Sequence, residues 1–489
     1  MTSLQQPAKQ HLRATLILAS LAQFMVVLDI FVVNVALPSI RHGLDFSEDG
    51  LQWVVNAYTI TFAGFLLLGG RAADLLGRRR VFVFGLMLFA LTSLGGGLAD
   101  SRTLLVVMRL AQGLGAAIIA PASLSILTTT FTDPAARHRA VGVWAAAGGA
   151  GGAAGSLVSG IITDVLGWRW ILFINVPIGL IAAICSARMI AEGRREGATR
   201  NFDFSGALTA TIGLTLLVFG IVRTDTTGWG DGGTLGVILA GVVLLFVFVL
   251  IEGRFAKAPL MPLRLFRSRS LSVANLLLGL FGAAVFPMWF FLSLYLQELK
   301  GHSPMVTGLI FLPMTGLFVV GSRLTSRILA WVPPRRLLIL GMLLTTCGML
   351  LFSRLTLDGS YLGQMLLPGV LVSFGMAFCF ITGTLSATSG VPSEDAGLAS
   401  ALTNNARLFG GAMGLAVLAA LATAHSASDL RHPTLAIHTS HQALLDGFHL
   451  AFLVSAGFVF VGALVAATLM PAQRAQSQAQ AASQIAVEV

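Results

Sequence analysis

The sequence predicts an all-α polytopic membrane protein with fourteen transmembrane helices, organised as two six-helix bundles plus two extra central helices. Three observations predict this fold class. The 489 residues are 56% hydrophobic and only 11% charged, whereas soluble domains carry about 25% charged residues. Apolar runs long enough to span a bilayer, roughly 17–25 residues each, recur from one end of the chain to the other. These runs are continuous and do not alternate with a period of two, which excludes a membrane β-barrel.

The expected spans form three groups along the chain. The first six lie near residues 13–38, 51–70, 81–99, 103–127, 140–163 and 170–190. Two more follow near 204–222 and 234–252, and the last six lie near 270–296, 304–326, 336–354, 360–387, 398–423 and 447–470. The predicted organisation is a cytoplasmic segment at 1–12, an N-terminal bundle at 13–190, a linker with the two extra helices at 191–269, a C-terminal bundle at 270–470 and a cytoplasmic tail at 471–489.

The net charge of +10 is explained by where the basic residues lie relative to the spans. Both termini and every second connecting segment together hold 22 of the 31 lysines and arginines. The opposite loops hold seven, and Arg109 and Arg407 fall inside spans. By the positive-inside rule, the segments rich in arginine, and with them both termini, are cytoplasmic. The basic balance is therefore a topology signal, and we expect no nucleic-acid partner.

The second span of each predicted bundle ends in a short basic loop. The loop is GGRAADLLGRRR in the first half and GSRLTSRILAWVPPRR in the second, at similar distances from the start of each half. Duplicated halves around a site at the membrane midplane are an architecture of secondary transporters.

The first of these loops is the strongest motif. Its glycines permit a tight turn between two helices, and a carboxylate there can accept hydrogen bonds from an arginine or from a helix N-terminus. We expect a conformational latch on the cytoplasmic side, formed by Gly70, Asp74, Gly77, Arg78 and Arg79. The alternative is a solvated loop whose charge only fixes the topology.

Asp29 is an ionisable residue in the otherwise apolar run MVVLDIFVVNVALP. A charge at that depth costs at least a few kcal/mol, so it must pair, take up a proton or line water. Asp29 lies nine residues before Pro38, about 13 Å below the outer face, and Arg109 lies eight residues after Ser101, about 12 Å below the same face. Two interpretations remain open: a static buried ion pair, or a proton site tuned by a nearby cation.

Several segments carry a family resemblance that extends over essentially the whole chain. The loop order Gly, Asp, Gly, Arg, Arg resembles the cytoplasmic-loop motif of the major facilitator superfamily. LDIFVVNVALP at 28–38 and LLVVMRLAQGLGAA at 104–117 resemble the first-helix and fourth-helix motifs of its fourteen-helix drug:proton antiporters, the EmrB/QacA-like subfamily. GWRWILFINVPIG, YLQELKGHSP and ASALTNNARLFGGAMG also match family segments. The resemblance implies that the first and fourth helices border one cavity.

One stretch departs from the family pattern. The fifth-helix antiporter motif reads Gly-x-x-x-Gly-Pro-x-x-Gly-Gly, but here GGAAGSLVSG has Ser156 in place of the proline and Ser159 in place of a glycine. Small residues such as Gly151, Gly155 and Gly160 still permit close helix packing. The missing proline removes a fixed bend, which weakens the inference of strict antiport.

Other polar residues inside spans are candidates for lining a substrate cavity, although each can equally bond a neighbouring helix. They are Gln23, Asn34, Asn56, Gln112, Asn405 and Arg407. The chain carries no phosphate-binding loop, and its cysteine spacings suit no metal. We therefore expect no metal site, no cofactor and no enzymatic activity, with the proton gradient as the energy source.

Together these features predict proton-coupled efflux of amphipathic small molecules, such as antibiotics, dyes or biocides, by alternating access. The expected partners are the small-molecule substrate, protons and the lipid bilayer, and the expected state is a monomer. The expected location is the bacterial cytoplasmic membrane, crossed many times with both termini inside. The alternatives are export of one dedicated metabolite or lipid, and a membrane sensor that transports nothing.

Overall fold

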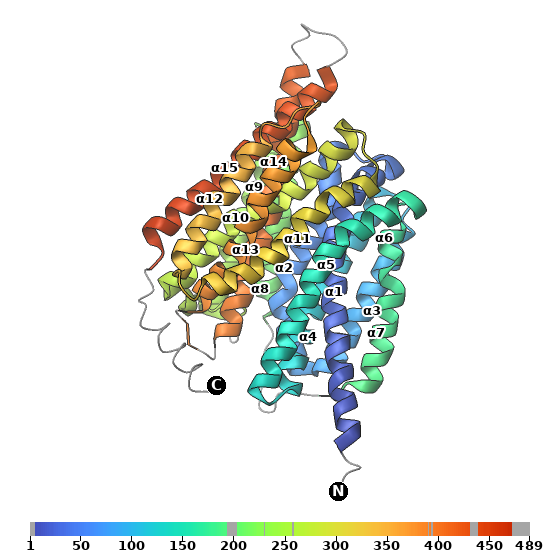
Figure 1. Cartoon of the computed structure of the whole chain (residues 1–489), viewed down its shortest axis with the longest axis vertical. Coiled ribbons are helices and arrows are strands. Elements are labelled where there is room, and N and C mark those ends of the chain that lie inside the picture. Colours follow the sequence, from blue (N-terminus) through green and yellow to red (C-terminus); the bar gives the residue numbers. More distant parts are fainter. Residues whose placement is uncertain are drawn as a thin grey trace. The chain divides into compact units, whose positions relative to one another are not determined.

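The computed structural model describes residues 5–192, 203–228, 230–256, 259–389, 391–392, 395–430 and 439–471, and within these ranges every long element is a helix (Figure 1). Parts of three predicted segments lie outside the described residues. They are residues 1–4 of the N-terminal segment, 193–202 of the linker with Arg194, Arg195 and Arg200, and 472–489 of the tail with Arg474. Lys257 and Arg431 lie outside them as well.

The helices follow the predicted spans closely. The first nine are α1 (Gln5–Leu44), α2 (Glu48–Leu76), α3 (Arg78–Gly97), α4 (Arg102–Thr130), α5 (Pro134–Leu166), α6 (Trp170–Phe173), α7 (Asn175–Met189), α8 (Phe204–Thr227) and α9 (Gly232–Leu250). The last six are α10 (Arg269–Leu294), α11 (Pro304–Ile328), α12 (Pro334–Phe352), α13 (Leu367–Thr388), α14 (Ala396–Leu430) and α15 (Thr439–Leu469). One turn of π-helix extends α9 at Ile251–Phe255 and α10 at Tyr295–Leu299, another precedes α13 at Leu362–Leu366, and a short 3-10 helix covers Leu263–Arg267.

Fourteen helical stretches of the described chain are long and apolar enough to cross a membrane. This confirms the predicted count and the all-α fold class. Two spans differ from expectation in detail. The first was expected to end at Pro38, but α1 continues through this buried proline to Leu44. The sixth is interrupted between α6 and α7, where Pro177 lacks an N–H and its ring crowds the carbonyl four residues earlier, at Phe173.

Several helices begin at a side chain that accepts a hydrogen bond from the first turn. Such caps satisfy backbone N–H groups that have no partner inside the helix. The capping pairs are Ser47 with Gly50 N, Ser101 with Leu104 N, Asp133 with Ala136 N, Asp203 with Gly206 N and Asp231 with Thr234 N. At Asp231, which lies outside the spans, the bond from Thr234 N lowers the pKa of the carboxyl. Local sequence therefore sets where these helices start.

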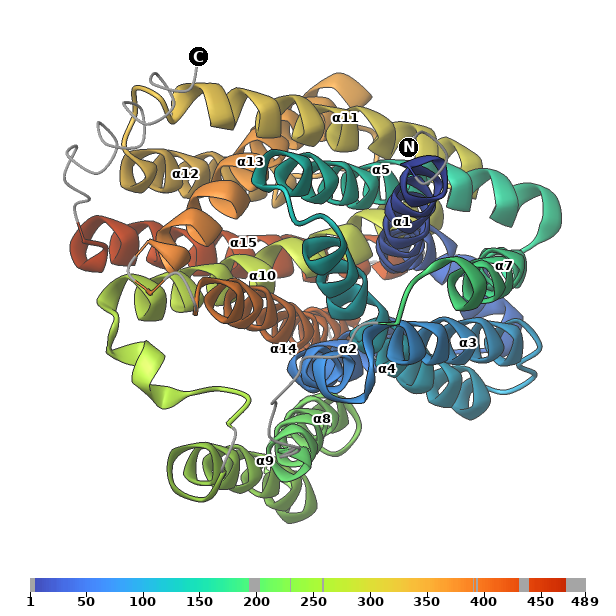
Figure 2. The same ribbon diagram turned by 90° about the horizontal axis from the view of Figure 1, so that it is seen from below.

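The helices cluster into two units by their contacts. Unit 1 comprises Met1–Met261 and Trp289–Leu312, and unit 2 comprises Pro262–Met288 and Pro313–Val489. Within unit 1, α1 packs along α5, and α4 packs against both α2 and α3; within unit 2, α12 packs against α13 and α15 (Figures 1 and 2).

The two extra helices, α8 and α9, pack on each other and belong to unit 1, where α8 rests on α2 (Figure 2). A Cβ at Gly64 of α2 would lie only 2.0 Å from the hydroxyl oxygen of Thr211, so this glycine lets the two helices approach closely. Nearby, the rings of Trp53 and Phe219 lie 6.3 Å apart. The segment Trp289–Leu312 also clusters with unit 1, and Trp289 packs edge-on against Phe31 of α1 at 5.8 Å.

Candidate functional site: a buried carboxylate–guanidinium network

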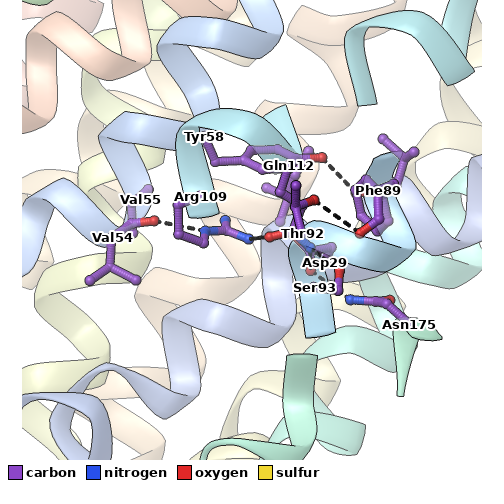
Figure 3. Close-up of polar contacts among 12 residues, drawn as sticks. Asp29, Val54, Val55, Tyr58, Phe89, Thr92, Ser93, Arg109, Gln112 and Asn175 are labelled. Carbon is purple, nitrogen blue, oxygen red and sulfur yellow. Dashed lines mark hydrogen bonds and ion pairs between the residues drawn. The ribbon is translucent and has the colours of Figure 1, made fainter. Parts of the chain in front are cut away.

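Asp29 lies in the middle of α1, and its side chain is completely removed from solvent (Figure 3). Its Oδ2 accepts a hydrogen bond from Arg109 Nη1 at 2.6 Å. Its Oδ1 accepts one from Gln112 Nε2 and one from Asn175 Nδ2, each at 2.8 Å. Three donors on one carboxylate compensate much of the cost of burying its charge.

Arg109 comes from α4 and is 2% exposed. Besides the ion pair, its Nε donates to the Val54 carbonyl at 3.0 Å, and its Nη1 also donates to Gln112 Oε1 at 2.6 Å (Figure 3). Its guanidinium carbon lies 4.4 Å from the centre of the Tyr58 ring, a cation–π contact. Arg109 therefore has a charge partner, two neutral acceptors and an aromatic face.

Five helices contribute to this network: α1, α2, α3, α4 and α7. Gln112 also donates to Ser93 Oγ of α3 at 2.7 Å, and Asn175 is the first residue of α7, directly after the break that follows α6. Asn175 Oδ1 is buried without a hydrogen-bond partner among the described residues. The network therefore links these five helices around the Asp29–Arg109 pair.

This geometry lets a proton and the ion pair compete for the same atoms. Each oxygen of Asp29 already accepts from a nitrogen donor, so a proton on Oδ2 would displace Arg109 Nη1. Releasing Arg109 would leave a buried cation without its counter-ion, which favours rearrangement of the surrounding helices. A proton on Asp29 would therefore alter contacts made by residues of several helices.

The predicted latch loop forms a second polar cluster, at the junction of α2 and α3. Asp74 Oδ1 accepts from Arg78 Nη2 at 3.0 Å and from Ser125 Oγ at 3.3 Å, while Arg78 Nε donates to Ser125 Oγ at 2.7 Å. Gly77 joins the two helices with a φ of 108°, a conformation that side chains disfavour. Gly70 packs closely against Pro121 of α4. A Cβ built at Gly70 would lie 3.3 Å from the Cβ of Pro121.

Arg79 pairs with an acid outside the loop, Glu192. Glu192, just beyond α7, lies 3.4 Å from Arg79 Nε and 3.5 Å from Arg80 Nε. The loop is thus anchored to α4 by Ser125 and to the end of α7 by Glu192, both within unit 1.

Three of the other polar candidates do not join the network. Asn34 donates to the Ile30 carbonyl of its own helix at 3.0 Å, and Asn56 donates to Gln52 Oε1 at 3.5 Å. Gln23 lies on α1 facing Gly148 of α5, where a Cβ would be 3.3 Å from Gln23 Nε2. Its Oε1 is buried without a partner among the described residues.

Asn405 and Arg407 lie on α14, which belongs to unit 2. Arg407 Nη2 donates to Asn404 Oδ1 at 2.8 Å, and its guanidinium carbon lies 5.3 Å from the Phe286 ring centre and 5.2 Å from that of Phe380. Asn405 Oδ1 is buried without a partner in the described part of the chain.

The region that departs from the antiporter motif forms a close contact between α5 and α1. A Cβ at Gly151 would lie 2.5 Å from the Phe24 carbonyl oxygen, and one at Gly155 would lie 2.7 Å from Phe31 Cβ. Ser159, where the motif has glycine, donates its hydroxyl to the Val32 carbonyl of α1. Gly160 and Ser156 face α11, where Pro304 and Gly308 approach their backbone. Without the proline, α5 runs uninterrupted from Pro134 to Leu166.

Sequence reasoning missed several contributors to these clusters. Ser93, Asn175 and Tyr58 surround the buried pair, and Ser125 and Glu192 hold the loop. A weak signal existed for Asn175, a lone amide in the apolar stretch WILFINVPIG. Nothing in the sequence singled out Ser93 from the many serines of the spans.

Comparison with known proteins shows the family to which this chain belongs. The sequence profile of the Major Facilitator Superfamily matches residues 19–415. The chain belongs to the major facilitator superfamily. It is 44% identical over 405 residues to the cephamycin export protein CmcT of Amycolatopsis lactamdurans, covering 82% of this chain and 83% of that protein. It is 37% identical over 467 residues to the puromycin resistance protein pur8 of Streptomyces alboniger, covering 95% and 91%. Members of this superfamily are transporters of small molecules and not enzymes, and this member is a multi-pass membrane protein.

Solved structures support the same fold. The POT family transporter PepTSo aligns with a TM-score of 0.66 at 16% identity, covering 96% of this chain and 98% of that one. A D-xylose–proton symporter aligns with a TM-score of 0.64 at 14% identity, covering 95% and 99%. At such low identity these likenesses concern the fold alone.

Proposed function

We propose that this protein exports amphipathic small molecules, antibiotics among them, across a bacterial cytoplasmic membrane in exchange for protons. The observation that carries the proposal is the Asp29–Arg109 pair, a carboxylate with no solvent exposure inside a superfamily transporter. Secondary transporters use such intramembrane carboxyls as proton sites. Alternating access would then link the occupancy of the pair to the direction in which the substrate site opens.

The direction of transport and the substrate class are supported by the relatives. CmcT is named for the export of cephamycin, and a protein of Streptomyces glaucescens, 36% identical over 83% of this chain, for tetracenomycin C resistance and export. The protein Stp of Mycobacterium tuberculosis, 34% identical over 84% of this chain, is named for multidrug resistance. These three relatives are thus named for export or resistance.

A second candidate function is export of one dedicated metabolite. The name of CmcT, which has the highest identity of the relatives above, refers to a single compound class. The same site geometry serves both functions, because the proton site and the substrate site need not share residues.

We further propose that the bundles 13–190 and 270–470 move during transport and that the Asp74–Arg78 cluster stabilises one conformation. Both termini are assigned to the cytoplasm because 22 basic residues lie on that side and seven on the other. The protein is proposed to act as a monomer, since one chain supplies all fourteen spans.

The function is tested by a susceptibility screen and by flux measurements. An efflux-deficient bacterial host that expresses the chain should resist several compounds of a chemically diverse panel. Resistance to one compound alone would favour the dedicated exporter. Purified protein in liposomes should then move those compounds uphill when a pH gradient is imposed. Binding without gradient-driven flux would instead identify a sensor that transports nothing.

A further inference from the structure

Arg407 is an intramembrane cation whose charge has no counter-ion among the described residues. It lies ten residues after Gly397, the start of its span, and therefore about 15 Å along the helix. Its terminal Nη2 is bound to the neutral amide of Asn404, and its Nε is buried without any hydrogen-bond partner in the described part of the protein.

The comparison with Arg109 shows what is missing. Arg109 pairs with Asp29 at 2.6 Å, and its Nε donates to a backbone carbonyl. The acid nearest to Arg407 in the sequence is Asp395, twelve residues earlier and just before α14, which is bound to Arg264 at 3.0 Å. A charge inside a membrane span that lacks a partner destabilises the protein, so an arginine in this position indicates a functional role.

The surroundings of Arg407 suit a ligand with an anionic group and an apolar body. The rings of Phe286 and Phe380, from α10 and α13, lie about equally far from the guanidinium carbon, at 5.3 and 5.2 Å. Aromatic faces attract the cation weakly but do not neutralise it. Part of the Arg407 side chain is exposed, although its Nε is buried.

We propose that Arg407 binds the carboxylate of the transported molecule, so that amphipathic organic anions are a preferred substrate class. This inference rests on the proposed function as a transporter. The planar guanidinium can donate its terminal N–H groups to the oxygens of a carboxylate. The Phe286 and Phe380 rings contact the apolar part of the same molecule.

The test compares two probes that differ only in charge. Binding of cefoxitin, an amphipathic carboxylate, and of its neutral methyl ester is measured by calorimetry with the full-length protein in detergent. The wild type should prefer the carboxylate by about tenfold or more, because a hydrogen-bonded charge pair contributes at least that ratio. Arg407→Gln should reduce cefoxitin binding to the level of the ester and leave ester binding unchanged. Arg407→Lys, which keeps the charge, should retain part of the preference.

The matched control is Arg354→Gln, which removes an equal charge at an exposed position after α12 and should leave the preference intact. Equal loss of both probes in Arg407→Gln would mean that the arginine only packs α14, and would overturn the proposal. A wild type without preference would overturn it too. Replacing gluconate by chloride as the buffer anion tests whether Arg407 is instead a site for small inorganic anions. If chloride competes with cefoxitin, the assignment of the site to the transported molecule is overturned. Gradient-driven export of any other compound would leave the transporter function standing in each of these cases.

Discussion

Arg109 Nη1 lies 2.6 Å from Asp29 Oδ2, and the two side chains are 2% and 0% exposed. The residues are 80 positions apart in the chain, on α4 and α1. Gln112 bridges the two side chains, because it donates to Asp29 and accepts from Arg109. A proton that binds Asp29 must therefore displace one of the hydrogen bonds that the carboxylate already accepts.

Asp29→Asn should abolish uphill export driven by a pH gradient while the protein still inserts and folds. Asparagine keeps the shape and most of the hydrogen bonds but cannot titrate. The measurement is drug-induced proton movement in liposomes, with Asp100→Asn, which changes an exposed carboxylate between α3 and α4, as the control. Undiminished proton-coupled flux in Asp29→Asn would make Asp29 a structural partner only.

The stability of the pair should be strongly non-additive. Arg109→Gln leaves a buried carboxylate without its cation and should destabilise the protein by about 3–5 kcal/mol. Adding Asp29→Asn removes the uncompensated charge, so the double variant should recover about 1–3 kcal/mol relative to the sum of the single variants. Chemical unfolding in detergent, followed by tryptophan fluorescence, measures all four proteins. Additive losses would show that the two charges do not interact energetically.

Asp74→Asn and Arg78→Ala should slow transport without weakening substrate binding. Their cluster with Ser125 is partly exposed and should contribute about 1–2 kcal/mol to one conformation, which shifts a two-state population about tenfold. Transport rate and equilibrium binding are measured side by side. Arg80→Ala is the control, because its side chain is 76% exposed and Arg79 keeps the contact with Glu192. Normal transport in both variants would favour a solvated loop.

Gly151→Ala should destabilise the contact between α5 and α1 by about 1–3 kcal/mol. The added Cβ would lie 2.5 Å from the Phe24 carbonyl oxygen and 3.2 Å from Leu28 N, and helix backbone cannot easily yield. Gly149→Ala is the matched control two residues earlier, where a Cβ meets nothing within 4 Å. The unfolding temperature should fall only for the first variant. An equal fall of the unfolding temperature in both variants would show that Gly151 does not lie at the close contact between the helices.

A reporter that is active only in the cytoplasm should be active when fused after Arg195 or Arg267 and silent near Thr227 or Ser428. The expectation follows from the distribution of basic residues and the fourteen spans. The opposite pattern would reverse the assigned orientation.

The all-α fold class and the number of spans could be predicted from the sequence alone. These depend on chain length and on the fixed rise of a helix, both of which are local. The caps at Ser101 and Asp133 are local too, since donor and acceptor lie three residues apart.

The groups that surround the buried charges could not be predicted from the sequence. Asn175 reaches Asp29 from 146 residues away and Ser125 reaches Arg78 from 47, because helix packing, and not sequence spacing, sets which faces meet. For the same reason the sequence grouped Asn405 and Arg407 with the polar residues of the first half. Packing placed Arg407 next to two aromatic rings, with no acid paired to it among the described residues. The sequence gives the position of a polar residue along its span, but the rotation of that span against its neighbours fixes whether the side chain finds a partner.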